Sequence, residues 1–183
     1  VISYRSIDRL GNAEDTRTLT LVLDETGPVI SAIVGEPKHG DYVTSATQII
    51  FLISDSGAGV AETQVVKSIS DPQYEAVDLL GNRSSITVNV IIDDTAPVTT
   101  AVVGSPRVGD FVRSSTPVTF TAEDSGVGVA RIESSDVVES GVRTVTYRAV
   151  DLLGNAEETW TFLLQVDDDP PVVTATIGDP HVE

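Results

Sequence analysis

The sequence predicts an all-β protein made of small antiparallel β-sandwiches in tandem. Three observations predict this fold class. One sequence pattern occurs three times, apolar and polar residues alternate in short runs, and no stretch of helix length shows a 3.6-residue period. Clusters of Gly, Pro, Ser, Asp and Asn separate the runs, as is typical of turns. Many short strands with closely spaced turn signals indicate antiparallel sandwiches.

The repeated pattern is Tyr-x-x-x-Asp-x-x-Gly-Asn, which begins at Tyr4, Tyr74 and Tyr147. Three further landmarks recur in the same order. They are linkers of the form Asp-x-Thr-x-Pro at 24–28 and 93–97, with a variant at 167–171; Asp-Ser-Gly-x-Gly-Val at 55–60 and 124–129; and aliphatic-Gly-x-Pro at 34–37, 103–106 and 177–180. We therefore expect the C-terminal part of a preceding repeat in residues 1–26, a first complete repeat in 27–95, a second complete repeat in 96–169, and the first strand of a following repeat in 170–183.

Alternating residues predict individual strands within these repeats. Apolar and polar residues alternate over 118–122, over 160–166 and over 86–92, which is the period of a half-buried strand. Residues 1–23 alone would form a hairpin with an exposed apolar face, and a lone hairpin is marginally stable.

Composition excludes several classes of function. The net charge of −17 disfavours binding to nucleic acid and to anionic membranes. The absence of cysteine excludes disulfides and Cys-based metal or catalytic sites. The longest apolar run, 49–53, is too short to span a membrane. His39 and His181 occupy unmatched positions, and no nucleophile, phosphate-loop or metalloprotease motif is present, so we do not expect an enzyme. Because the chain has no Met, we expect it to be a segment of a longer protein.

The Tyr pattern, the alternating strand after it and the Asp-x-Thr-x-Pro linker together resemble the bacterial immunoglobulin-like (Big-type) repeats of large cell-surface proteins and adhesins. The resemblance covers essentially the whole chain, although the third linker departs from it at Asp169 and Pro170. It implies an immunoglobulin-like sandwich, with the Tyr strand as strand F and Asp-Leu-Leu-Gly-Asn as the F–G loop. In such a fold Tyr147 and Ala149 point inward, and Asp151 lies at the end of the strand. It also implies an extracellular, cell-surface location.

In such domains the N-terminus and the B–C and F–G loops share one end, so each linker meets the loops of the domain that follows it. The carboxylates gathered there would repel one another unless a cation compensates them, and Ca²⁺ prefers oxygen ligands of this kind. We therefore expect interdomain calcium. The candidate ligands are Asp24, Glu25, Asp55, Asp78 and Asn82 at one junction, and Asp93, Asp94, Glu123, Asp124, Asp151 and Asn155 at the next. Alternatively, the aspartates only accept hydrogen bonds from loop amides, or the acidic surface only maintains solubility.

The predicted function is a non-catalytic stalk or spacer segment of an extracellular prokaryotic surface protein, as in an adhesin, stiffened by calcium. Its partners would be neighbouring repeats, with any host or surface glycan bound by regions outside this sequence.

One alternative is a surface-layer, sheath or filament subunit that self-associates through an apolar lateral face containing Ile50 and Leu52, unless these residues pack inside their own domain. A second is a carbohydrate-binding module of a secreted enzyme with Trp160 as its platform, although the alternation of Trp160 with Phe162 and Leu164 favours core packing.

Overall fold

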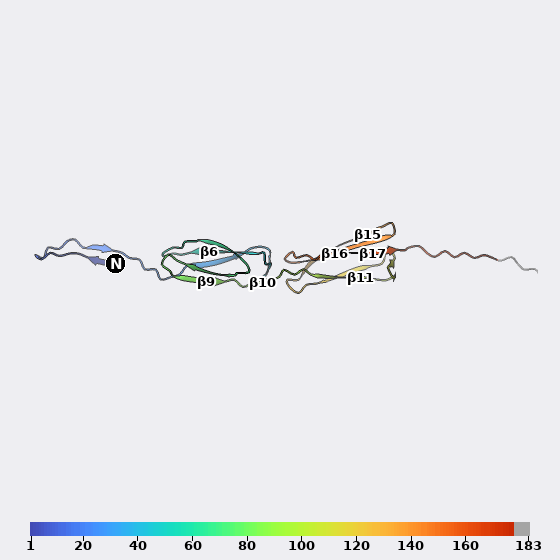
Figure 1. The fold of residues 1–183 in the computed structure, drawn as a ribbon, viewed down its shortest axis with the longest axis horizontal. Coiled ribbons are helices and arrows are strands. Elements are labelled where there is room, and N and C mark those ends of the chain that lie inside the picture. Colours follow the sequence, from blue (N-terminus) through green and yellow to red (C-terminus); the bar gives the residue numbers. More distant parts are fainter. Residues whose placement is uncertain (178–183) are drawn as a thin grey trace, which may run out of the picture. The chain divides into compact units, whose positions relative to one another are not determined.

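The computed structural model describes residues 1–177, which contain β-strands, turns and loops and no helix. The prediction of an all-β fold is therefore confirmed. Residues 170–177 of the segment predicted to form the first strand of a following repeat contain no strand, and the rest of that segment, including His181 and the last part of the landmark at 177–180, lies outside the described residues. The chain divides into two compact units, Val1–Ile91 and Ile92–Glu183 (Figure 1).

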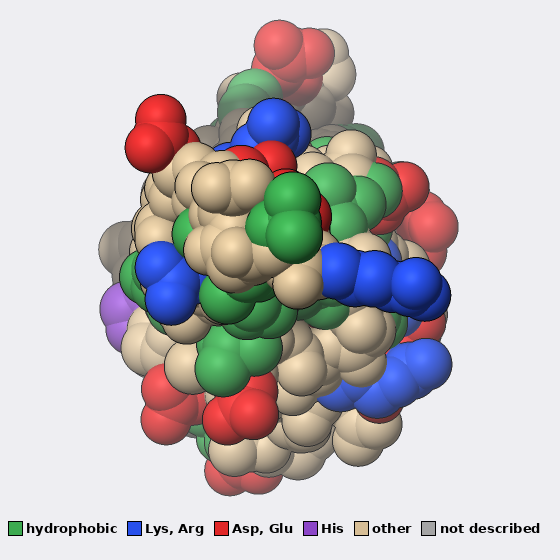
Figure 2. Space-filling model, turned by 90° about the vertical axis from the view of Figure 1, so that its left-hand side faces the viewer, with side chains coloured by type: hydrophobic (Ala, Val, Ile, Leu, Met, Phe, Trp, Pro, Cys, Tyr) green, Lys and Arg blue, Asp and Glu red, His purple; other side chains and the backbone are tan. Residues whose placement is uncertain are grey.

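The first unit begins with a two-stranded antiparallel hairpin, β1 (Ile2–Tyr4) and β2 (Arg17–Leu19). All six of these strand residues are exposed, including Ile2, Tyr4 and Leu19. Figure 2 views the molecule from the side on which the hairpin lies in Figure 1, and hydrophobic side chains are open to solvent in that view. The exposed apolar residues agree with the expectation that this hairpin lacks a core of its own.

The rest of the first unit has a three-stranded sheet in the order β3-β6-β7, a two-stranded sheet β8-β9 and a small sheet β10-β5-β4. The strands are β3 (Val29–Val34), β4 (Lys38–His39), β5 (Tyr42–Val43), β6 (Gln48–Ser54), β7 (Gln64–Ser68), β8 (Gln73–Val77), β9 (Arg83–Thr87) and β10 (Ile91–Ile92). The core between the sheets contains Val43, Ile49, Phe51, Ile53, Ile69 and Ala76. The single strand predicted over 86–92 is wrong, because β9 and β10 are separated at residues 88–90, where the Val88 amide donates to the Pro72 carbonyl.

The second unit has a two-stranded sheet, β11-β14, and a five-stranded sheet in the order β12-β13-β17-β16-β15. Its strands are β11 (Val98–Val103), β12 (Arg107–Val108), β13 (Phe111–Val112), β14 (Val118–Glu123), β15 (Val129–Glu139), β16 (Val142–Asp151) and β17 (Trp160–Val166). All pairs are antiparallel except β13 with β17, which is parallel. Val112, Val145, Ala149 and Leu164 are buried, and Asp151 ends β16 as predicted.

The outer face of the β3-β6-β7 sheet is apolar. The strand register aligns Ile33, Ile50 and Val66 in one row across the sheet, with Leu52 beside it on the same face of β6. Ile33, Leu52 and Val66 are all exposed and Ile50 is half-buried. In the second repeat the same positions of β14 carry Thr119 and Thr121.

Candidate cation site at the loop end of each repeat

Three aspartates that are far apart in the sequence lie together in the first unit. Asp24 belongs to the linker, Asp55 directly follows β6, and Asp78 directly follows β8. One carboxylate oxygen from each lies within 4.8 Å of the others. Within residues 1–177 this is the group of acidic and histidine side chains whose spacing fits a metal ion. The structure thus brings together one candidate from the linker and one from each of the two loops.

Backbone contacts between the loops explain this convergence. Val60 pairs with Asp78 in an isolated antiparallel bridge, and the Leu79 amide donates to the Gly59 carbonyl at 3.0 Å. The linker joins them because the Ala58 amide donates to Oδ2 of Asp24 at 2.6 Å. Gly57 permits this approach, since a Cβ at that position would overlap the Asp24 carboxylate.

The loop between β8 and β9 is held by its own aspartate, Asp78. Oδ1 of Asp78 accepts from the amides of Leu80 and Asn82, both at 2.8 Å, and Oδ2 accepts from Asn82 Nδ2 at 2.7 Å. Asn82 Nδ2 also donates to the Asp24 carbonyl at 3.2 Å, which ties this loop to the linker. Asp8 and Asn12 make the same loop in the hairpin. Part of the role of Asp78 is therefore the hydrogen bonding to loop amides that the alternative interpretation predicts.

The second unit repeats the arrangement with Asp93, Asp124, Asp151 and Asn155. Oδ2 of Asp93 accepts from the Val127 amide at 2.7 Å, and Oδ2 of Asp124 accepts from the amides of Gly126 and Gly128. Asn155 Nδ2 donates to Asp151 Oδ2 at 2.7 Å and to the Asp93 carbonyl at 3.1 Å. The same hydrogen-bond pattern thus arises from a second set of residues, although within residues 1–177 the metal-like spacing of carboxylate oxygens is found for Asp24, Asp55 and Asp78.

One oxygen in the second unit lacks a partner. Oδ1 of Asp124 is buried and has no hydrogen-bond partner among the described residues. The side chains of Asp93 and Asp151 are also buried, at 5% and 2% exposure. A buried carboxylate oxygen without a donor is costly, and a bound cation would remove that cost. The donor set, which consists of carboxylates, an amide and backbone carbonyls, is that of a hard cation such as Ca²⁺.

Hydrogen bonding also lowers the pKa of both linker aspartates. The pKa of Asp24 is lowered chiefly by the Ala58 amide and then by the hydroxyl and amide of Thr26. The pKa of Asp93 is lowered chiefly by the Thr95 hydroxyl and then by the Val127 amide, against an opposing effect of burial. Both carboxylates are therefore ionised, and able to ligate a cation, at neutral pH.

Three of the predicted calcium ligands do not belong to the group of aspartates that could hold a metal ion. Glu25, Asp94 and Glu123 are exposed, and none of them belongs to the Asp24–Asp55–Asp78 group. Asn82 and Asn155 act as hydrogen-bond donors through Nδ2, so only their Oδ1 atoms remain as candidate ligands. The glycines Gly57 and Gly126 also belong to the site, and their place in Asp-Ser-Gly-x-Gly-Val is the signal that identifies them.

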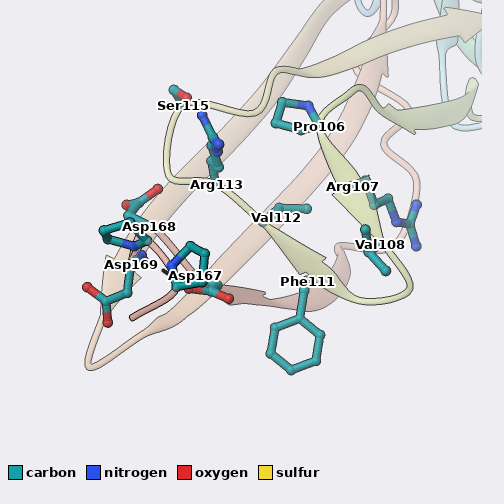
Figure 3. Close-up of a pocket in the computed structure, with 12 residues that line it drawn as sticks. Pro106, Arg107, Val108, Phe111, Val112, Arg113, Ser115, Asp167, Asp168 and Asp169 are labelled. Carbon is teal, nitrogen blue, oxygen red and sulfur yellow. Dashed lines mark hydrogen bonds between the residues drawn. The ribbon is translucent and has the colours of Figure 1, made fainter. Parts of the chain in front are cut away.

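A pocket of about 730 Å³ lies at another part of the second unit and includes residues that connect β17 to the following segment (Figure 3). Phe111, Val112 and two arginines, Arg107 and Arg113, line it together with three consecutive aspartates, 167–169. Asp168 Oδ1 accepts from the Ser114 amide at 3.0 Å, which fastens the exiting chain to the loop after β13. This pocket contains none of the predicted cation ligands.

Trp160 lies at the start of β17, opposite Tyr147, and is 56% exposed. Its position is at the margin of the core, because Phe162 and Leu164 on the same face are more deeply buried.

No protein-family model matches this chain, and no curated protein matches it. The described part of the chain contains no helix with the length and apolarity needed to cross a membrane.

Proposed function

We propose that this chain is a non-catalytic spacer segment of an extracellular prokaryotic surface protein, built from tandem immunoglobulin-like domains that bind Ca²⁺ at their loop ends. The observation that carries the proposal is the group of Asp24, Asp55 and Asp78 in the first unit, whose carboxylate oxygens lie within 4.8 Å of one another. The second unit repeats the hydrogen bond from the glycine-rich loop to a linker aspartate. The unpartnered Oδ1 of Asp124 supports a cation over hydrogen bonding alone.

Calcium would act on the linker. Asp24 and Asp93 are linker residues, and each is already hydrogen-bonded to the glycine-rich loop of the repeat that follows it. A cation shared by the linker and loop carboxylates would add bonds that the unfolded chain lacks. Each linker would then be fixed onto its repeat, which is the property that a spacer needs.

Calorimetric melting of the chain in calcium and in EDTA tests this proposal. At a calcium concentration about 100 times Kd, binding adds about 2.7 kcal/mol to the free energy of unfolding. For domains of this size we expect a rise in Tm of roughly 10 °C or more. Asp124→Asn should remove most of the rise in the second unit, and Asp55→Asn should do the same in the first. Glu123→Gln is the matched control and should keep the rise. An unchanged Tm in EDTA would count against structural calcium.

A second candidate function is lateral assembly into a filament or layer. The exposed row formed by Ile33, Ile50 and Val66, with Leu52 beside it, supports this candidate. Leu52→Glu should abolish any concentration-dependent association seen by analytical ultracentrifugation, whereas Thr121→Glu, at the equivalent position of the second repeat, should not. A monomer at all concentrations would remove this candidate.

A further inference from the structure

One strand position that is filled in the first repeat is open in the second. β6 lies between β3 and β7, so both of its edges are paired. β14, which corresponds to β6, pairs only with β11 within the described residues. The strand that could have covered its other edge, β15, pairs along its length with β16 in the opposite sheet.

The open position leaves apolar side chains partly uncovered. Phe51 on β6 is fully buried, whereas Phe120 on β14 is only half-buried. The aromatic pairs beneath have similar spacing, with ring centroids 5.2 Å apart for Phe51 and Tyr74 and 5.1 Å apart for Phe120 and Tyr147, although the first pair is stacked and the second is tilted. The second repeat therefore has an aromatic pair at the same position but lacks a strand equivalent to β7 to cover it.

β7 shows what kind of strand fits such a position. Val65 pairs with Phe51 and Lys67 pairs with Ile49 in an antiparallel register. Lys67 Nζ lies 5.9 Å from the centroid of the Tyr74 ring, so a cation covers the aromatic pair. A strand that fits this position would have alternating apolar residues. It would place an apolar residue opposite the phenylalanine, as Val65 is, and a basic residue two positions later, as Lys67 is.

The β14 edge carries few of the charges by which exposed strand edges are commonly protected. Its single charged residue is Glu123 at the last position, whereas β15, the edge strand of the other sheet, contains Arg131, Glu133, Asp136 and Glu139. Charged side chains on an edge discourage pairing with another chain, and an uncharged edge of β-branched and aromatic residues favours it. The two edges of the second repeat therefore differ in their capacity to accept a strand.

We propose that the open edge of β14 binds an extended strand of a separate polypeptide, antiparallel, with an apolar residue opposite Phe120 and a Lys or Arg opposite Val118. The basic residue would face Tyr147, as Lys67 faces Tyr74. The contact of Lys67 with Tyr74 in the first repeat and the net charge of −17 favour a basic strand over an acidic one. Main-chain pairing supplies the affinity, and the alternating side chains supply the selectivity. This binding activity goes beyond the proposed spacer function and does not depend on calcium.

The probe is a capped peptide with the sequence of residues 63–70, added to the full chain. We expect saturable slowing of amide hydrogen exchange at 118–122, measured residue by residue by NMR. The matched internal control is β6, whose edge is already paired and whose amides should not change. The peptide carrying Lys67→Glu should bind at least five-fold more weakly. Phe120→Leu in the chain should weaken binding several-fold while the β11–β14 amides keep their protection.

Three results would overturn the proposal. The first is no protection of β14 at millimolar peptide, and the second is equal binding of the charge-reversed peptide. The third is protection of β14 without peptide, together with dimers in analytical ultracentrifugation, because the occupant would then be a second copy of this chain.

Discussion

The third strand of each repeat, β7 in the first and β15 in the second, belongs to a different sheet in the two repeats. In both, the residue after the second loop glycine bridges to the aspartate that follows the Tyr strand, Val60 to Asp78 and Val129 to Asp151. β7 then pairs with β6, whereas β15 continues along β16. The first repeat gains a three-stranded sheet that buries Phe51, and the second gains a five-stranded sheet.

The turn before the Tyr strand differs between the two repeats. Ser140 and Gly141 both have positive φ, 51° and 77°, and they connect Glu139 to Val142 as a two-residue hairpin loop. In the first repeat, the Asp71 amide donates to the Ser68 carbonyl in a turn that is followed by Pro72, and β8 starts only at Gln73. The hairpin loop favours the pairing of β15 with β16, and the first repeat has no such loop to bring β7 onto β8.

The largest expected effect comes from removing the arginine that fastens β15 to the core. Arg143 is 6% exposed and donates to both carboxylate oxygens of Asp136 and to the Thr116 carbonyl. Arg143→Ala should lower the free energy of unfolding of the second unit by about 2–3 kcal/mol, less than for a fully buried pair because Asp136 is 40% exposed. Arg148→Ala, which removes an exposed pair with Glu133, should cost less than about 1 kcal/mol. Urea unfolding measures both, and equal costs would refute this ranking.

The next effect tests the hairpin turn itself. Gly141→Val places a β-branched residue at a φ of 77° and should cost roughly 1–3 kcal/mol in the second unit. Gly141→Asn should cost less, because Asn tolerates this conformation. Hydrogen exchange should show faster exchange in β15 than in β11 for the Val variant. If both variants were equally stable, the turn would not determine the pairing of β15.

A smaller effect comes from a glutamate that joins the two sheets of the second repeat. Glu157 accepts from the Thr99 hydroxyl and amide on β11 and from the Ala149 amide on β16. Burial raises its pKa, but these hydrogen bonds outweigh burial and leave the pKa lowered. Glu157→Gln should cost about 1 kcal/mol, whereas Glu158→Gln, at the exposed neighbour, should be neutral within about 0.5 kcal/mol. Ser84 and Ile30 occupy these positions in the first repeat, so its two sheets lack this tie.

The smallest expected effect is a loss of folding stability at acid pH, which we expect in both units. The pKa values of Asp24 and Asp93 are lowered in the folded protein, so their contribution to stability is present above the unfolded pKa and is lost as pH falls through the folded pKa. Without calcium, stability should decline below about pH 4. Asp24→Asn and Asp93→Asn should each flatten that decline in Tm, and Glu25→Gln should not. A decline that is unchanged in both Asn variants would place its origin in other carboxylates.

Much of the candidate site could be predicted from the sequence, because its residues lie at positions that strand periodicity and turn chemistry define. Asp55, Asp78, Asp124 and Asp151 all stand at strand ends beside glycine-containing turns. Their hydrogen bonding could not be predicted in the same way. The burial of Asp93 and the unpartnered Oδ1 of Asp124 depend on loops from different parts of the chain meeting at one point.

The sequence by itself determined the all-β character and the positions of the turns, because alternation, glycine and proline act over a few residues. The tertiary structure alone decided which sheet receives the third strand, which edge stays open and which carboxylates are buried. Those outcomes depend on competition between distant partners, β6 against β8 and β14 against β16, and no local pattern encodes the result of that competition.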